Sequence, residues 1–210
     1  MATELVSDDF SGYGTGDPIT NGNWAEHGAS WLVNASEEAQ PDDGNEGNAR
    51  NTGSAVDEDC YAEITIGQMN SDTGLVGPAC RMLSTATTTY YYRGRAVAGI
   101  DSAIGRLVGG TNTTMDTDGA DDFSAGTVCR IEVEGHDGST VKAFHDASEV
   151  MPGNSDTNID SDQGTMYTGM TCNNANATDK TVSSFSGGNL ADPAAGGLPA
   201  GSLALLGVGI

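Results

Sequence analysis

The residues best suited to binding chemistry lie in the run Asp-Thr-Asp-Gly-Ala-Asp-Asp at positions 116–122. Asp116, Asp118, Asp121 and Asp122 would place several carboxylates on a loop that contains a glycine, and Ca²⁺ prefers about six to eight oxygen ligands in such loops. The spacing is not that of an EF-hand, which needs Gly at its sixth position and Glu at its twelfth. The run predicts a candidate calcium site, and the alternative is that these acids are simply solvated.

A second candidate site follows from the run TYYYRGR at 89–95. Tyr91, Arg93 and Arg95 alternate, so they share one face of a strand. If that face met solvent, it would suit an acidic glycan or the carboxylates of a partner, and Trp24 would offer a further aromatic surface for binding. The alternative is a salt bridge to the chain's own acids, because the sequence has 30 Asp and Glu against 8 Lys and Arg.

Side chains for nucleophilic catalysis are not arranged in any recognisable motif. The sequence has no Gly-x-Ser-x-Gly elbow, and His27, His136 and His145 are expected in turns or at strand ends. Glu132 and Glu134 share a strand face, but a lysine is expected opposite Glu132, which makes that face an ion-paired surface.

The clearest folding signal is the segment 126–150, where two alternating runs flank His-Asp-Gly. This pattern predicts a β-hairpin. A two-residue loop would place Val133 opposite Lys142 and mix apolar and charged groups on both faces. A three-residue loop with a left-handed glycine places Val133 opposite Val141 and Glu132 opposite Lys142, which separates an apolar face from a charged one. We therefore expect the three-residue loop.

The remaining chain carries short alternating runs between turn residues, 30 glycines and no sustained helical period, which predicts an all-β fold. Outside the hairpin, strands are expected at 5–10, 29–33, 51–55, 60–69, 74–82, 89–98, 104–109, 165–172 and 181–185. We expect 60–69 and 74–82 to pair as a hairpin, and 112–122 and 154–163 to be acidic loops. The predicted architecture is a two-sheet antiparallel β-sandwich in one domain, 1–187, followed by an apolar tail, 188–210.

The cysteines, Cys60, Cys80, Cys129 and Cys172, alternate with apolar residues and are expected in the core. None has the CxxC spacing of a zinc site. Buried free thiols that act as small hydrophobes are the first interpretation, and one or two disulfides across the core are the second.

The formal net charge of −22 argues against binding to nucleic acid or to anionic membranes. No apolar run approaches the ~20 residues needed to cross a bilayer, so no membrane span is expected. The first ten residues lack the basic and apolar regions of a signal peptide. The apolar side chains expected to dock on a protein partner are those of the tail: Leu203, Leu205, Leu206, Val208 and Ile210.

The order of the elements resembles the concanavalin A-like lectin/glucanase jelly roll, including laminin G-like modules. The resemblance covers residues 5–190 and rests on an opening Asp-Asp-Phe, then DCYAEITIGQ, GLVGPACRM, YYYRGRAVAG, the RIEVEG and VKAFHD pair, and TVSSFSG. It implies a lectin-like sandwich that could bind a glycan. Glycoside hydrolases of this fold carry Glu-x-Asp-x-x-Glu on one strand. That spacing is missing here, and Asp57, Asp59 and Glu63 come nearest to it, so we expect no catalysis.

These observations together predict a non-catalytic structural or adhesion module on the surface of an assembly. The most specific version is a decoration, fibre or tail protein at the surface of a phage virion, joined to protein partners through the tail. The alternative is an extracellular carbohydrate-binding module or a degenerate glycoside hydrolase. No cofactor is expected apart from the candidate Ca²⁺.

Overall fold

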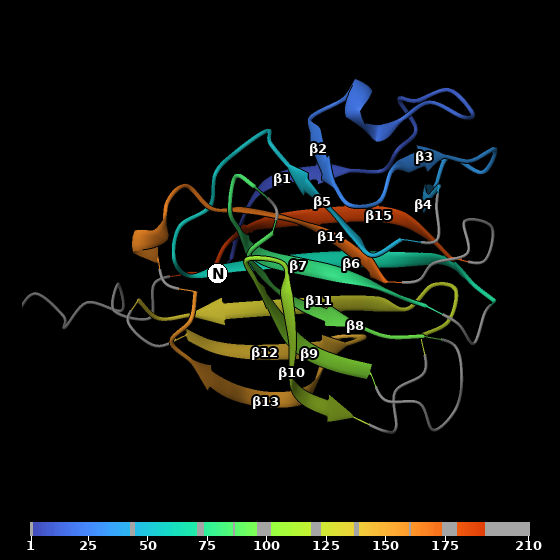
Figure 1. Cartoon of the computed structure of the whole chain (residues 1–210). Helices are drawn as coiled ribbons and strands as arrows, with labels where there is room; N and C mark the ends of the chain where they lie inside the picture. Colours follow the sequence, from blue (N-terminus) through green and yellow to red (C-terminus); the bar gives the residue numbers. More distant parts are fainter. Residues whose placement is uncertain are drawn as a thin grey trace, which may run out of the picture.

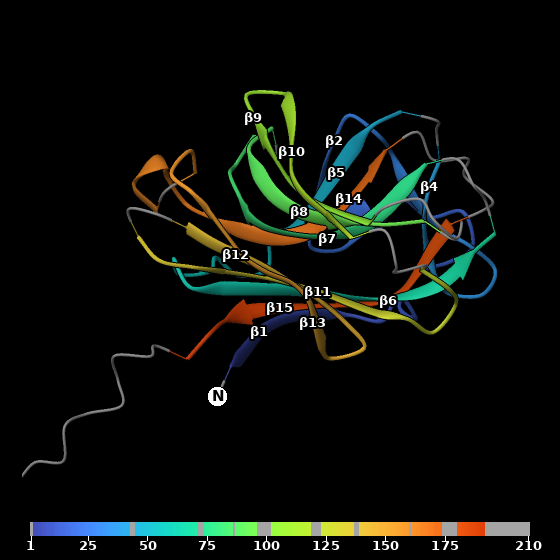
Figure 2. The same cartoon turned by 90° about the horizontal axis from the view of Figure 1, so that it is seen from below.

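The computed structural model describes residues 2–42, 45–70, 74–85, 87–95, 102–118, 123–136, 139–159, 161–173 and 180–191. Within these ranges the chain forms fifteen strands and two short 3₁₀ turns, η1 (Ile19–Asn21) and η2 (Ser161–Gln163), and no α-helix. The strands form two antiparallel sheets that pack face to face (Figures 1 and 2). The predicted all-β sandwich is therefore confirmed.

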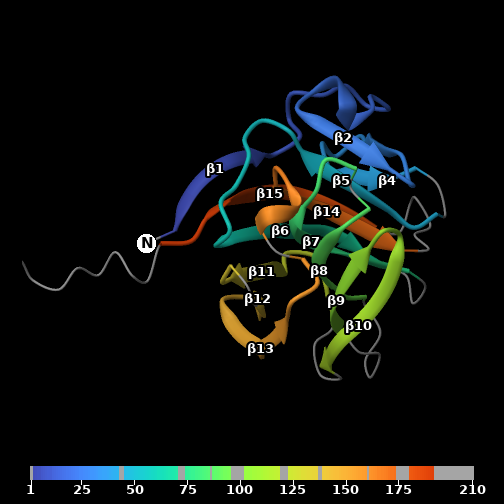
Figure 3. The ribbon, with the colours of Figure 1, turned by 60° about the vertical axis from the view of Figure 1, so that its left-hand side comes forward.

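The first sheet contains β1 (Thr3–Asp8), β3 (Trp31–Val33), β4 (Ala39–Pro41), β6 (Cys60–Met69), β11 (Val128–Glu134), β12 (Ser139–His145), β13 (Ser148–Asp156) and β15 (Lys180–Asn189). Its order is β13-β12-β11-β6-β15-β4-β3, and β1 pairs with β15. Figure 3 shows β1 running alongside β15. The first and last strands of the described chain are thus neighbours in one sheet.

The second sheet contains β2 (Trp24–His27), β5 (Gly47–Asn51), β7 (Leu75–Met82), β8 (Thr89–Arg93), β9 (Ser102–Val108), β10 (Thr111–Asp118) and β14 (Tyr167–Asn173). Its order is β10-β9-β8-β7-β14-β5-β2. The core lies between the sheets and includes Trp31, Tyr90, Tyr92 and Phe185 among its large side chains.

The hairpin formed by β11 and β12 has the predicted register. Val133 lies opposite Val141, and Glu132 lies opposite Lys142. Val133 and Val141 are fully buried, so the apolar face meets the core as expected. The turn glycine, Gly138, lies outside the described residues. The choice between two registers by the chemistry of the facing side chains is confirmed.

The predicted hairpin of 60–69 with 74–82 is wrong, because β6 and β7 belong to different sheets (Figure 2). β6 pairs with β11 and β15, whereas β7 pairs with β8 and β14. Both strands need their apolar residues against the core, and placing one strand in each sheet satisfies both. Adjacency in the sequence therefore did not mean pairing here.

Two segments expected to be acidic loops are partly strand. β10 occupies Thr111–Asp118, and β13 reaches Asp156. Both are edge strands, and β10 is exposed along most of its length. An edge strand solvated on both faces has no alternating pattern, which is why polarity suggested a loop. The short strands β2 and β4 were also missed.

All four cysteines are buried and free, which confirms the first interpretation of their role. β15 continues to Asn189, two residues past the expected domain boundary, and the backbone N–H of Leu190 donates to the carbonyl of Asp59 at 2.8 Å. The proposed docking residues of the tail, from Leu203 to Ile210, lie outside the described residues. Within the part of the chain that is described, no helix has the length and apolar character needed to cross a bilayer.

Candidate functional site

A groove of about 890 Å³ lies beside β1 and is the principal candidate site. Its walls come from β1, from the loop that follows it, from turns near β2 and β5, and from the middle of β6 and β15. Among the described residues that line it are the carboxylates of Glu4, Asp8, Asp9 and Glu63, with no lysine or arginine. The groove is therefore an acidic cavity assembled from segments far apart in the sequence.

Asp8 organises the loop that forms one wall of this groove. Its carboxylate accepts hydrogen bonds from the backbone N–H of Phe10 at 2.8 Å, the Tyr13 hydroxyl at 3.0 Å and Trp24 Nε1 at 2.7 Å. The first of these bonds is a local turn of the kind that aspartate favours. Phe10 has a left-handed backbone, with φ of 58°, and its ring is fully buried in the core. Burial, reinforced by the hydrogen bond to Asp8, raises the pKa of Tyr13 far above its ordinary value.

Hydroxyl and amide groups line the rest of the groove. Ser184 Oγ lies 2.9 Å from Thr65 Oγ1 on the neighbouring strand, and Ser186 lines the same wall. Asn23 and Asn51 contribute amides, and Asn51 Oδ1 accepts a hydrogen bond from the backbone N–H of Gly53 at 2.9 Å. Mixed donors and acceptors around a cavity are what a polyhydroxyl ligand needs.

Trp24 does not provide the exposed aromatic surface suggested by the sequence. Its ring is only 4% exposed and packs edge-on against Phe185, with ring centroids 4.9 Å apart. It belongs to the core, and its contribution to the groove is the hydrogen bond that holds Asp8 in place. The polar residues on either side of Trp24 obscured this role.

The face that carries Tyr91, Arg93 and Arg95, which we name the Tyr91 strip, is closed by its own side chains. Tyr91 is 3% exposed, and the guanidinium carbon of Arg93 lies 3.8 Å from the centre of its ring. Arg93 Nη1 forms an ion pair with Glu46 Oε1 at 2.8 Å, and the Tyr91 hydroxyl donates to Asn112 Oδ1. Arg95 is half-buried. For Arg93, the alternative of a salt bridge to the chain's own acids is therefore what is observed, and Tyr91 has no open face for a sugar.

The four aspartates of the candidate calcium site are only partly within the described residues. Asp116 and Asp118 lie on β10, and Asp121 and Asp122 lie outside the described residues. The Asp116 carboxylate accepts hydrogen bonds from Asn154 Nδ2 and from the backbone N–H of Thr117, both at 2.9 Å. Among the described residues, no cluster of three or more His, Cys, Asp or Glu could hold a metal ion.

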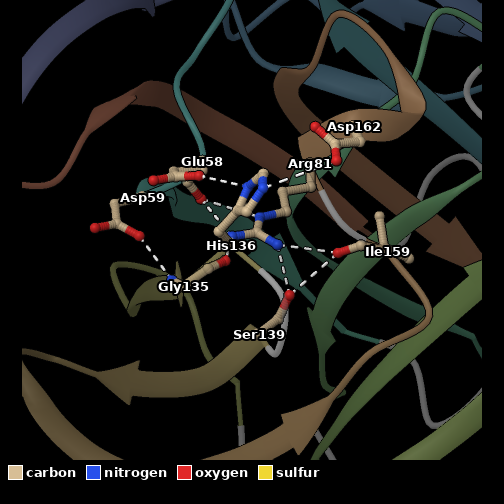
Figure 4. A network of polar contacts seen from close by, with 8 residues as sticks. All are labelled: Glu58, Asp59, Arg81, Gly135, His136, Ser139, Ile159 and Asp162. Carbon is tan, nitrogen blue, oxygen red and sulfur yellow. Dashed lines mark hydrogen bonds and ion pairs between the residues drawn. The ribbon is translucent and has the colours of Figure 1, made fainter.

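A network that the sequence did not predict surrounds Arg81, which is fully buried on β7 (Figure 4). Its Nε donates to the carbonyl of Glu58 at 3.0 Å, and its Nη2 donates to the same carbonyl at 2.7 Å and to that of Gly135. Its Nη1 donates to Ser139 Oγ at 2.5 Å and to the carbonyl of Ile159 at 2.9 Å. Every N–H of the guanidinium thus has an acceptor, and none of these acceptors is a carboxylate.

The Arg81 network joins the second sheet to turns of the first. The backbone N–H of Gly135 also donates to Asp59 Oδ1 at 2.7 Å, and His136 Nδ1 lies 2.9 Å from Glu58 Oε2 (Figure 4). Arg81 itself has a left-handed backbone, with φ of 49°. The one signal in the sequence was an arginine at the end of the apolar run GLVGPAC. We name Arg81 and its four acceptor segments the Arg81 clamp.

No protein-family model matches the sequence, and a search of curated proteins finds no similar sequence. Solved structures do match the fold. The carbohydrate binding module CBM66 from Bacillus subtilis has 14% identity and a TM-score of 0.54, over 80% of this chain and 92% of that chain. A glycosyl hydrolase family 16 protein from Mycobacterium smegmatis has 10% identity and a TM-score of 0.54, over 88% and 100%. The carbohydrate recognition domain of Emp47p has 12% identity and a TM-score of 0.51, over 80% and 89%.

At these identities the likeness is one of fold. The chain has the two-sheet jelly-roll β-sandwich seen in these three structures, which is consistent with the fold that the resemblance implied. Function has to be argued from the site, because one fold can host many activities.

Proposed function

We propose that this chain is a non-catalytic carbohydrate-binding module and that its glycan binds in the acidic groove beside β1. The observation that carries the proposal is the groove itself, a cavity of about 890 Å³ lined by hydroxyl, amide and carboxylate groups. Sugars are bound through such groups, which exchange hydrogen bonds with the ring hydroxyls. The fold shared with proteins named as carbohydrate-binding modules and carbohydrate recognition domains supports this choice.

The charge of the groove favours a neutral or amine-bearing glycan. Glu4, Asp8, Asp9 and Glu63 line it, and no lysine or arginine is among the described lining residues. Arg130 Nη1 lies 3.7 Å from Glu63 Oε2 and offsets one of these charges, but the whole chain keeps a formal net charge of −22. Uronate or sulfate groups would be repelled by this field, most strongly at low salt. The acidic glycan considered for the Tyr91 strip is therefore replaced by a ligand without negative charge.

Binding without hydrolysis is favoured by the hydrogen bonds of the groove carboxylates. Asp8 accepts bonds from Phe10, Tyr13 and Trp24, and Asp9 accepts bonds from the backbone and hydroxyl of Ser11. A glycosidase needs one carboxyl group that can donate a proton to the leaving oxygen and another that is free to attack or to activate water. Asp8 and Asp9 instead serve as acceptors that shape the loop.

The test uses two matched substitutions on exposed serines in edge strands of the same sheet. Ser7 lies on β1 and lines the groove, whereas Ser155 lies on β13, away from the groove lining. Binding is measured by calorimetry against soluble neutral glucans, xylans and fructans, against chitosan oligosaccharides, and against polygalacturonate. We expect the native chain to bind a neutral or amine-bearing glycan, Ser7→Trp to weaken binding by about tenfold or more, and Ser155→Trp to leave it unchanged.

Failure to bind any member of this panel, or equal losses in the two variants, would remove the groove as the binding site. Release of reducing sugar from the bound glycan would overturn the non-catalytic part of the proposal.

The finer form of the proposal is display of this module on the surface of a larger assembly, such as a phage virion. It is supported by the apolar sequence from Leu203 to Ile210. Deleting 192–210 is the appropriate test, because it keeps β15 and the Leu190 hydrogen bond. The shortened chain should fold and bind glycan as before but fail to join its assembly. Normal incorporation would contradict this form of the proposal.

A further inference from the structure

Two of the four buried thiols meet across the core. Cys60 begins β6 in the first sheet, and Cys80 lies on β7 in the second. Their side chains are hydrogen-bonded to each other, and both residues are fully buried in the same hydrophobic cluster. Cys80 Sγ also lies 3.6 Å from the carbonyl oxygen of Ile131, on the strand that pairs with β6. The two sulfur atoms therefore face each other from opposite sheets.

The surroundings of the two thiols differ in a way that suits oxidation. The hydrogen bond from Cys80 lowers the pKa of Cys60, and the nearby charge of Arg81 acts in the same direction. Burial raises the pKa of Cys80 well above its ordinary value. Because the thiolate is the reactive form of cysteine, these directions favour Cys60 as the thiol that reacts first with an oxidant and Cys80 as the thiol that then attacks the oxidised Cys60.

A cleft lies beside the residues that lead into Cys60, although neither cysteine lines it. The cleft, of about 550 Å³, is lined by Asp57, Glu58 and Asp59, the residues that immediately precede Cys60. Met166 and Leu190 line the same cleft. Because Cys60 and Cys80 are fully buried, we expect a peroxide to reach them from this cleft only when the segment of Glu58 and Asp59 opens transiently.

We infer that Cys60 and Cys80 form a built-in oxidation site, at which a disulfide can tie one sheet of the sandwich to the other. With hydrogen peroxide as oxidant, the Cys60 thiolate attacks one oxygen, the O–O bond breaks, and hydroxide leaves to become water. The resulting sulfenic acid is attacked by the Cys80 sulfur, the S–S bond forms, and a second water leaves. Two thiols lose two electrons and two protons in total, and the peroxide is reduced to two waters.

Such a bond would join the two layers of the sandwich covalently. It would close a loop of about 20 residues between neighbouring strands of different sheets, and in the chain-entropy account closing such a loop destabilises the unfolded state. We expect oxidation to raise the thermal midpoint by roughly 6–12 °C for a chain of this size, and a reductant to reverse the change.

The sequence makes the bond easy to identify. Arg50 and Arg81 are successive trypsin sites, so both cysteines fall on the single peptide 51–81. Cys129 falls on the peptide 107–130, and Cys172 falls on 143–180. After mild peroxide treatment of the folded chain and digestion without reduction, peptide 51–81 should be lighter by the two thiol hydrogens. Any other pairing would produce cross-linked peptides instead.

Two controls complete the experiment. The variant Cys172→Ala should still form the internal bond in peptide 51–81, and protein oxidised in urea should give mixed cross-linked peptides. The inference is overturned if the folded chain keeps all four thiols under conditions that oxidise the unfolded chain, or if a pair other than 60 and 80 forms. A bond of the expected pairing that leaves the thermal midpoint unchanged would overturn its role as a tie between the sheets.

Discussion

The acidic groove and the Arg81 clamp are each organised around one charged side chain. Asp8 lines an open cavity, whereas Arg81 is fully enclosed by protein. Asp8 accepts three hydrogen bonds from its own loop and from Trp24, and the cavity above it stays open and lined by oxygen groups. Arg81 is enclosed by four segments that accept every one of its N–H groups. The difference suggests separate roles for the two regions. An open acidic cavity can bind a ligand, whereas a buried cation with all its N–H groups hydrogen-bonded stabilises the fold.

The largest expected effect is loss of the clamp. Replacing Arg81 with Met would leave the carbonyls of Glu58, Gly135 and Ile159 without their donor in a buried region. Unsatisfied buried acceptors and a lost charged hydrogen-bond network cost about 3–5 kcal/mol in all. Urea denaturation should therefore show a free energy of unfolding lowered by that amount.

The control for this variant is Arg50→Met. Arg50 is only half-buried and lies 4.8 Å from the centre of the Tyr167 ring, so its loss should cost about 1 kcal/mol or less. Equal effects in the two variants would mean that the clamp is no more important than an ordinary surface contact.

The second effect is a loss of stability at alkaline pH through Tyr90, which lies on β8 opposite Cys80, the residue before Arg81. Burial raises the pKa of Tyr90 to about 12, and its hydroxyl donates to Asp156 Oδ2 at 2.8 Å. Because the folded pKa lies above the unfolded value of about 10, this tyrosine stabilises the fold fully below pH 10, and the contribution is lost as the pH rises toward 12. We expect Tyr90 alone to lower the free energy of unfolding by about 1.4 kcal/mol per pH unit in that window, in addition to the contribution of Tyr13.

Denaturation measured at several alkaline pH values, in the native chain and in Tyr90→Phe, isolates this contribution. The substituted chain should be less stable at neutral pH but should lose less stability above pH 10. Parallel curves for the two chains would show that another group controls the alkaline behaviour.

The smallest effect is expected in the groove. Tyr13→Phe removes one of three hydrogen bonds to Asp8, and Tyr13 is only partly buried. The cost should be about 1 kcal/mol, measured by the same urea denaturation. A loss as large as that of Arg81→Met would mean that the groove is also a stability element and would weaken the contrast between the two regions.

The sequence predicted features that depend on the pattern of side chains within one strand or one turn. The β11–β12 register followed from matching Val133 with Val141, and the burial of the cysteines followed from their alternation with apolar residues. The pairing partners of β6 could not be found in this way, because several apolar strands of the chain have patterns that would allow backbone hydrogen bonds to β6. β10 was missed because an edge strand needs no buried face.

The two polar regions were hidden for another reason. The groove is formed by segments that meet only in the folded chain, so no local spacing marks it. The clamp consists mainly of main-chain carbonyls, which every residue has, so only Arg81 and Ser139 could leave a trace in the sequence. Trp24 shows the reverse error, since its polar neighbours suggested exposure while its ring lies in the core.

The pairing of β1 with β15 has a consequence for how the chain folds as it is made. Thr3 lies opposite Asn189, so the groove wall that these strands share cannot exist until almost the whole described chain has left the ribosome. Contacts between such distant residues slow folding, since a long loop must close before they form. Until then the edge of β1 and the inner face of the first sheet stay uncovered, and this interval is when newly made chains are most exposed to aggregation.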